Sequence, residues 1–181
     1  MRENKFIAYR DLLYEACGKH FGKVLCVELV GTSCFRVTLE SRVIKARIRP
    51  KGKSTELFKE AHELVELPPI LLETEHGSIP LRFMEWWEGY EFHRLRGNGI
   101  PPRYFHKYGE FIGKLNNHGI YTWDAPWNNV IYTPHNDSVI MCDDDAYVDT
   151  DRNYNERFLG TIATDDQRKA YYDGYRMWNA A

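Results

Sequence analysis

The chain has 181 residues, enough for one domain or two small lobes with a sizeable core. Its 24 lysine and arginine residues stand against 26 aspartate and glutamate residues, a net charge of -2, so neither a nucleic acid nor an anionic membrane is expected as its main partner. No apolar run reaches the roughly 18–20 residues that span a bilayer, and the charged start MRENKFIAYRDLLYEA lacks the pattern of a secretion signal. The four cysteines show no CxxC pairing, which favours reduced core thiols in a cytoplasmic protein.

The first half of the chain is predicted to form a helix, three strands, a second helix and two more strands. Residues 5–19 place apolar side chains at helical spacing. From Lys23 the runs KVLCVELV, CFRVTLE and RVIKARI alternate and are rich in valine and isoleucine, which predicts three antiparallel strands. Residues 54–67 (STELFKEAHELVEL) return to helical spacing, and Pro68 and Pro69 end that helix. The run PILLETEHGSIPLRFMEW predicts two strands around a turn at His76 and Gly77.

The second half is predicted to be mostly helical with one small hairpin. Residues 102–119 form a helix with an apolar side made of Phe105, Tyr108, Phe111, Ile112 and Leu115. The runs NVIYT and SVIMC flank the turn PHND, and residues 146–181 are polar, aromatic and partly helical in pattern. Strands and helices are segregated along the chain, which predicts an α+β plan in two lobes with a ligand site between them.

Five polar residues fit poorly into these apolar elements. Lys45 lies inside the strand VIKARI, and Glu60 lies on the helix that follows. Asp124 and Asn129 are five residues apart in the loop after the long helix, and Asp143 comes directly after the strand SVIMC. Buried or half-buried polar groups are unfavourable unless they are satisfied or used. A strand lysine, a helix glutamate, an Asp-x4-Asn loop and a later aspartate occur in this order in protein-kinase phosphoryl-transfer sites.

The segments that carry these residues resemble the protein-kinase-like superfamily. They are most similar to its small-molecule and sugar phosphotransferases (aminoglycoside phosphotransferase-like and lipopolysaccharide-core kinase-like proteins), and the resemblance runs from about Lys23 to Val148. VIKARI resembles the nucleotide-binding lysine strand, LFKEAHELVEL the following helix, and LRFMEWWEGYEF the interlobe hinge. GEFIGKLNNHGIYTWDAPWNNVIY resembles the helix, catalytic loop and next strand, and VIMCDDD the metal-binding strand end.

The resemblance implies a two-lobed α+β fold of the protein-kinase type. Residues 1–22 would form an N-terminal helix, and residues 23–88 an N-lobe with an antiparallel sheet, one main helix and the hinge. Residues 89–181 would form a truncated, mostly helical C-lobe that carries the catalytic loop.

The same resemblance implies a site for ATP and Mg²⁺. Lys45, oriented by Glu60, would hold the α- and β-phosphates. Asn129 and Asp143 would hold Mg²⁺, and Asp124 would be the catalytic acid that orients the acceptor hydroxyl. The remaining cofactor contacts are expected from the turn at Gly31, Thr32 and Ser33, for phosphate, and from the hinge around Glu85 and Trp87, for adenine.

Several features depart from the family pattern. Thr122-Trp123-Asp124 stands where many members have His-Arg-Asp or His-Gly-Asp, and the glycine-rich turn is reduced to VGTSCF with Gly31 as its one glycine. Asp143-Asp144-Asp145 stands where Asp-Phe-Gly is common. An extra carboxylate there would join the metal shell or face water, and residues beyond Asp143 are freer to turn outward than the residue directly after the buried strand. Only 36 residues follow Asp145, which argues against a regulated protein kinase.

Structural explanations for these residues stay open. Lys45 fits an ordinary lysine of an edge strand, and Glu60 a solvated helix residue. Asp124 and Asn129 fit turn formers around Pro126, and residues 143–145 fit a solvated acidic turn.

Two functions from different classes stay open as well. In the first, the protein transfers the γ-phosphoryl group of ATP to a hydroxyl of a small molecule or glycan. In the second, it is a pseudokinase-like module with weak or no catalysis that binds a partner protein. The acceptor contacts would come from residues 90–105 and 146–181, where the resemblance is least specific.

Overall fold

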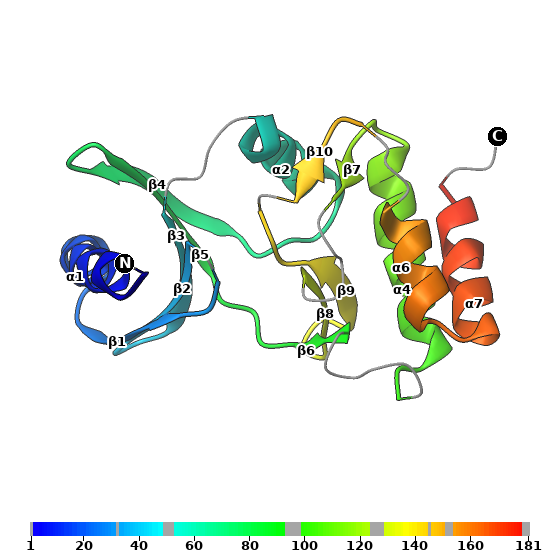
Figure 1. The fold of residues 1–181 in the computed structure, drawn as a ribbon, viewed down its shortest axis with the longest axis horizontal. Helices are drawn as coiled ribbons and strands as arrows, with labels where there is room; N and C mark the ends of the chain where they lie inside the picture. Colours follow the sequence, from blue (N-terminus) through cyan, green and yellow to red (C-terminus); the bar gives the residue numbers. More distant parts are fainter. Residues whose placement is uncertain are drawn as a thin grey trace. The chain divides into compact units, whose positions relative to one another are not determined.

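The computed structural model describes residues 2–31, 33–48, 53–92, 99–123, 129–144, 146–150 and 154–178. The chain divides into two compact units. We call residues 1–50 and 68–87 the sheet unit, and residues 51–67 and 88–181 the helical unit. Element labels follow Figure 1.

The sheet unit consists of one helix and a five-stranded antiparallel sheet (Figure 1). Helix α1 (Arg2–Phe21) is followed by β1 (Val24–Leu29), β2 (Cys34–Leu39) and β3 (Val43–Ile48). Strands β4 (Ile70–His76) and β5 (Ile79–Glu85) form a hairpin whose turn carries Gly77 at a φ of +62°. The strand order is β1-β2-β3-β5-β4, so β3 lies at the centre of the sheet.

The core of the sheet unit lies between α1 and one face of the sheet. Strand side chains alternate between faces, and the set on this face is almost fully buried. Helix α1 contributes Leu13, Ala16 and Cys17, and burial raises the pKa of the Cys17 thiol to about 12. The strands contribute Val27, Phe35, Val37, Leu39, Ile44, Ala46, Ile48, Leu81 and Phe83. The cysteines are unbridged, but Cys26 is exposed on β1, so the expectation that all four lie in the core is wrong.

The helical unit is built from α-helices and two small sheets. Its elements in chain order are α2 (Lys53–Leu64), β6 (Tyr90–Glu91), α4 (Pro102–Asn116), β7 (Tyr121–Thr122), β8 (Val130–Thr133), β9 (Ser138–Met141), β10 (Tyr147–Val148), α6 (Tyr154–Ile162) and α7 (Asp165–Arg176). Strands β6, β8 and β9 form one antiparallel sheet, and β7 pairs with β10.

Helices α4 and α7 pack against each other (Figure 1). Glycines lie at the points of closest approach. A Cβ atom at Gly109 would lie 2.0 Å from the carbonyl oxygen of Tyr171, and one at Gly174 would lie 2.1 Å from the carbonyl oxygen of His106. Both obstructing atoms belong to the backbone of the facing helix. The two helices therefore approach each other at a distance that excludes any side chain at these positions.

Gln167 fixes the beginning of α7 while fully buried. Its Oε1 accepts a hydrogen bond of 2.8 Å from the Thr164 N–H, and its Nε2 donates one of 2.8 Å to the Ile100 carbonyl. The Thr164 hydroxyl in turn accepts from the Gln167 N–H, which completes a capping box. A buried amide that is satisfied at both ends stabilises the helix start.

Helix α2 contacts later elements of the helical unit. The Phe58 ring packs edge-on against Tyr147 of β10, with centroids 5.3 Å apart. The Ser54 hydroxyl donates to the Asp144 carbonyl at 3.4 Å, and Glu66, just beyond the helix, accepts from Asn136 at 3.0 Å. Although α2 lies between two strands of the sheet unit in sequence, its partners come from residues much later in the chain.

The predicted α+β class, the antiparallel sheet and the longer helices are confirmed. The two-residue strands β6, β7 and β10 were not predicted, because so short a segment shows no periodicity. None of the helices in the described ranges combines the length and apolar character needed to cross a membrane.

Candidate functional site

The predicted site residues are divided between the two units. Gly31, Ser33, Lys45, Glu85 and Trp87 belong to the sheet unit, and Glu60, Asn129 and Asp143 to the helical unit. Thr32 and Asp124 lie outside the described residues.

Lys45 lies at the centre of the sheet on the face opposite α1. Its direct neighbours are Arg36 of β2 and Met84 of β5, and directly paired residues share a face. Two residues further along β3, Arg47 stands between Cys34 and Arg82 on the same face. The edge-strand explanation for Lys45 is therefore wrong, because the sheet order places β3 between β2 and β5.

The cations on this face are largely removed from water. Lys45 is 9% exposed, Arg47 7% and Arg82 0%. Arg82 Nε lies 2.9 Å from Glu73 Oε1, and Arg36 Nη1 lies 2.9 Å from Glu28 Oε2. The Arg36 guanidinium also lies over the Trp86 ring, 5.6 Å from its centroid. The sheet thus presents one apolar face to α1 and one polar face. We call this polar face the basic face, because it carries four cations, two of which are paired with the carboxylates of Glu28 and Glu73.

The turn between β1 and β2 is held by backbone hydrogen bonds. The N–H groups of Val30 and Gly31 both donate to the Cys34 carbonyl, at 3.0 and 3.1 Å. The Ser33 carbonyl accepts from Ile48 at 2.9 Å, which ties the turn to the end of β3. A Cβ at Gly31 would meet Cys34 Cβ at 3.4 Å, an ordinary contact, so the turn does not require glycine there.

The predicted hinge follows β5. The Glu85 N–H donates to the Pro69 carbonyl at 3.0 Å as part of the β4–β5 hairpin. The indole N–H of Trp87 donates to Glu85 Oε2 at 3.4 Å. The Glu85 amide is thus already used inside the sheet unit, and the contact of the hinge with adenine stays a prediction.

In the helical unit, the β8–β9 hairpin brings Asn129 and Asp143 to the same end. Val130 pairs with Met141, and the Cys142 N–H donates to the Asn129 carbonyl at 2.7 Å. Asn129 directly precedes β8 and lies opposite Cys142, and Asp143 is the next residue, so both Asn129 and Asp143 lie at this end of the hairpin, beyond the last strand pair. Both side chains are half-buried.

The segment before Asp124 reaches this same end of the hairpin. The Trp123 N–H donates to the Ala146 carbonyl at 2.8 Å, and Thr122 pairs with Tyr147. The Ala146 N–H closes a turn onto the Asp143 carbonyl at 3.2 Å. Residues from three separate segments therefore meet around Asp143.

Asp144 does not turn outward. Its side chain is fully buried, and its carbonyl accepts the Ser54 hydroxyl of α2. The turn after Asp143 folds the chain back into β10, which places Asp144 on the inner side. The alternative in which Asp144 faces water is therefore wrong, and Asp145 lies outside the described residues.

A buried hydrogen-bond chain braces the strand that precedes Asp124. The Tyr108 hydroxyl of α4 donates to Asn155 Oδ1 at 2.6 Å, and Asn155 Nδ2 donates to the Thr122 hydroxyl at 3.3 Å. Tyr108 is fully buried and Thr122 is 5% exposed. Sequence spacing gave no sign of this role for Asn155, because its partners come from distant segments.

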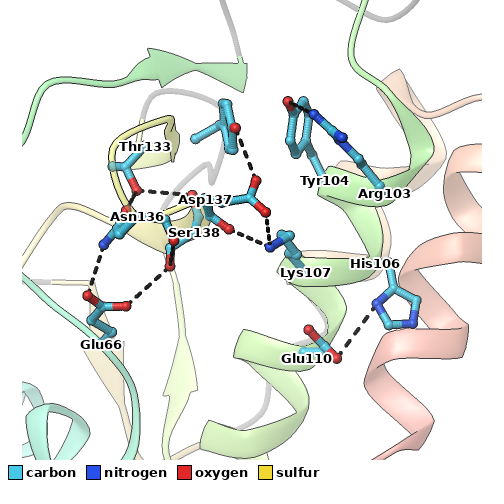
Figure 2. Close-up of polar contacts among 11 residues, drawn as sticks. Glu66, Arg103, Tyr104, His106, Lys107, Glu110, Thr133, Asn136, Asp137 and Ser138 are labelled. Atoms are coloured by element: carbon cyan, nitrogen blue, oxygen red, sulfur yellow. Dashed lines mark hydrogen bonds and ion pairs between the residues drawn. The ribbon is translucent and has the colours of Figure 1, made fainter.

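The opposite end of the β8–β9 hairpin is fixed to α4 and to Glu66 (Figure 2). Asp137 adopts a φ of +50° in the turn, and Lys107 Nζ contacts its carboxylate at 2.8 Å. Hydrogen bonds from Lys107 and then from Tyr132 lower the pKa of Asp137. Glu66 accepts from Asn136 and Ser138 at 3.0 and 3.3 Å. These contacts hold the hairpin in place from its turn.

Glu60 is exposed on α2, as is Glu63. Because Lys45 belongs to the other unit, the pairing of Lys45 with Glu60 stays a prediction.

Within the described ranges, no group of three or more histidine, cysteine, aspartate or glutamate side chains gathers to hold a metal ion. Mg²⁺ is commonly bound by one or two protein carboxylates together with substrate phosphates and waters. One amide oxygen from Asn129 and one carboxylate from Asp143 fit that kind of site.

No family model matches the chain, and no curated protein matches its sequence. Among solved structures, the chain is similar to the bifunctional kinase-methyltransferase WbdD, with a TM-score of 0.50 and 16% sequence identity. The match covers 71% of this chain and 33% of that one, so the matched part spans about a third of the larger protein. At this identity the likeness shows the fold alone. The chain therefore has a kinase-like α+β fold, and the likeness indicates no particular family.

Proposed function

We propose that the protein is an ATP- and Mg²⁺-dependent phosphotransferase that acts on a hydroxyl group of a small molecule or glycan. The observation that carries this proposal is the meeting of Asn129, Asp143 and the Trp123 segment at one end of the β8–β9 hairpin. A phosphoryl-transfer site needs a metal-binding pair close to the residue that orients the acceptor. Trp123 directly precedes Asp124, the residue proposed for that second task.

In this proposal each residue has a separate role. Lys45 holds the α- and β-phosphates with Glu60 as its orienting partner, and Asn129 and Asp143 hold the metal. Asp124 orients the acceptor oxygen. Bound Mg²⁺ would neutralise charge on the phosphates. Positioning and electrostatic stabilisation supply nearly all of the catalysis in this reaction class.

The kinase-like fold supports this reaction class. The structural neighbour is described as a kinase-methyltransferase, and the matched part is one third of that protein. Carrying a kinase activity over to this chain is therefore a proposal. The basic face around Lys45 and the bracing of Thr122 by Asn155 are the features of the chain itself that fit it.

A pseudokinase-like module that binds a partner protein is the second candidate. The observation that favours it is the turn at residues 30–33, where the N–H groups of Val30 and Gly31 donate to Cys34 and not outward. A turn of this kind offers fewer amides to phosphate than a glycine-rich loop does.

Thermal melting with and without nucleotide separates the two candidates. A ligand present at a hundredfold excess over its Kd stabilises the folded state by about 2.7 kcal/mol. For a chain of this size, that corresponds to a rise in Tm of about 5–11 °C. We expect Mg²⁺-ATP to give such a rise and ATP with a chelator to give clearly less.

Asp143→Asn should remove most of the Mg²⁺-dependent part of that rise. Asp173→Asn is the matched control, because it removes one carboxylate from an exposed position on α7. Asp144→Asn should lower the Tm of the ligand-free protein, since Asp144 is buried, and keep the nucleotide-dependent rise. If the wild-type protein shows no shift with any nucleotide, the enzyme proposal is wrong and the binding module is favoured.

A further inference from the structure

Lys45 has a second cation beside it on the same strand. Arg47 is two residues further along β3, so both side chains leave the same face of the sheet, separated by roughly 6.6 Å along the strand. Arg47 pairs in register with Cys34 on one side and with Arg82 on the other. Position 47 therefore extends the basic face from the middle of β3 toward the end of the strand.

The end of β3 is also where the β1–β2 turn is attached. Ile48, the residue after Arg47, donates its N–H to the Ser33 carbonyl at 2.9 Å. Cys34, the register partner of Arg47, is the first residue of β2 and accepts from the N–H groups of Val30 and Gly31. Arg47 is thus the basic residue of this face that lies nearest to the turn predicted to meet phosphate.

The N–H groups of Val30 and Gly31 donate to the Cys34 carbonyl within the turn, so they are not available to a phosphate. A phosphate bound at this turn therefore needs a positively charged side chain nearby. A guanidinium group offers a fork of donors that matches two phosphate oxygens, and it stays charged at all ordinary pH values. With Arg47 only 7% exposed, such a contact would lie in a medium of low dielectric constant, where attraction is stronger than in water.

We propose that Arg47 is a second phosphate-binding residue of the nucleotide site. It would contact a phosphate group of ATP beside the one that Lys45 holds, in place of the amides that a glycine-rich turn would supply. This inference rests on the proposed function, since it concerns the same nucleotide.

The test compares the affinities of Arg47 variants for nucleotides that differ in their number of phosphates. Binding of Mg²⁺-ATP, ADP, AMP and adenosine is measured by calorimetry for the wild-type protein, Arg47→Gln and Arg47→Lys. Loss of a charge-assisted hydrogen bond should weaken ATP binding by about 10- to 100-fold in Arg47→Gln. Adenosine, which has no phosphate, should bind both proteins equally. Arg47→Lys should lie between the two, because it keeps the charge and loses the fork.

The matched control is Arg42→Gln. Arg42 is exposed in the β2–β3 turn, at the other end of β3, and lies over the Phe21 ring. It should bind all four compounds like the wild-type protein. If the Arg42 and Arg47 variants lose the same amount of ATP affinity, the loss comes from the change in net charge and not from a contact of Arg47 with phosphate. That result would overturn the inference.

The two levels of the proposal fail differently. A wild-type protein that binds none of the nucleotides refutes the proposed function and the role of Arg47 together. If the wild-type protein binds ATP and Arg47→Gln binds it equally well, the inference is wrong while the proposed function stands. If Arg47→Gln loses ATP and adenosine to the same extent, the residue supports the fold and does not bind phosphate.

Discussion

Replacing Gly174 or Gly109 with alanine tests the packing of α4 against α7. A Cβ at position 174 would lie 2.1 Å from the His106 carbonyl oxygen and 3.0 Å from the Glu110 amide nitrogen. An ordinary contact begins near 3.4 Å, and the obstructing atoms are backbone, so no side chain can move aside. The helices would have to separate by more than an ångström along this line.

The expected effect is the difference between two terms. Forcing extra volume into a packed interface destabilises by about 1–3 kcal/mol, and rigid backbone on both sides places this case at the upper end. Alanine favours a helix over glycine by about 0.8–1.0 kcal/mol. The net loss is therefore about 2 kcal/mol, which lowers the Tm by roughly 4–8 °C. The double variant should lose less than the sum, because one separation of the helices relieves both contacts.

Gly160→Ala provides the matched control with the opposite sign. Gly160 lies inside α6, is exposed, and a Cβ there would meet nothing within 4 Å. Only the helix preference of alanine acts, so the Tm should rise by about 2–4 °C. Melting is followed by circular dichroism on all variants in one buffer. If Gly174→Ala raises the Tm as Gly160→Ala does, α4 and α7 do not pack as described.

Two further predictions concern the effect of burial on the reactivity of cysteines and on the pKa values of tyrosines. Cys26, exposed on β1, should react with iodoacetamide in the native protein, whereas Cys17 should react only on unfolding, because it is fully buried and its thiol has a pKa of about 12. Mass spectrometry of the digested protein checks this, and comparable rates at both sites would contradict the burial of Cys17. Burial also raises the pKa values of Tyr108, Tyr147 and Tyr171, so the folded state keeps protons that the unfolded chain loses above about pH 10. The contribution of these tyrosines to the free energy of unfolding should therefore be constant below that pH and fall above it. Urea titrations at pH 8 and 11 should show a smaller fall in Tyr108→Phe than in the wild-type protein. An equal fall in both proteins would refute the raised pKa of Tyr108.

Sequence periodicity predicted the strands and helices whose pattern is contained within one short segment. Alternation identified β1 to β5 because each strand presents one face to α1, and helical spacing identified the buried side of α4. The position of Asn129 and Asp143 at one end of the β8–β9 hairpin was also accessible from sequence, since Asn129 precedes β8, Asp143 lies just after β9, and a short turn joins the two strands. Their roles toward a metal stay a prediction.

Non-local relations were not predictable in the same way. The helical pattern of α2 shows that one of its faces is buried, but it does not show which element packs against that face. The contact of Phe58 with Tyr147 was therefore not predicted. The burial of Asp144 depends on the turn after Asp143, and three successive aspartates suggest solvent. Asn155 joins Tyr108 to Thr122 across long stretches of sequence, and such a partner can only be found once the fold is known.

The interrupted course of the sheet unit has a consequence for how the chain folds during synthesis. The chain leaves this unit after Pro50 and returns to it at Pro68, and α2 lies in between. Once Trp87 has emerged from the ribosome, all five strands of the sheet are present and can pair. Helix α2 has emerged by then as well, but Tyr147 and Asp144, which it contacts, have not yet been made. The apolar side of α2, including Phe58, therefore lacks these partners during that interval. A proteolytic cut within residues 51–67 would place β1 to β3 and β4 to β5 on different fragments, whereas a cut just after Trp87 would leave the five strands on one fragment and separate α2 from Tyr147 and Asp144.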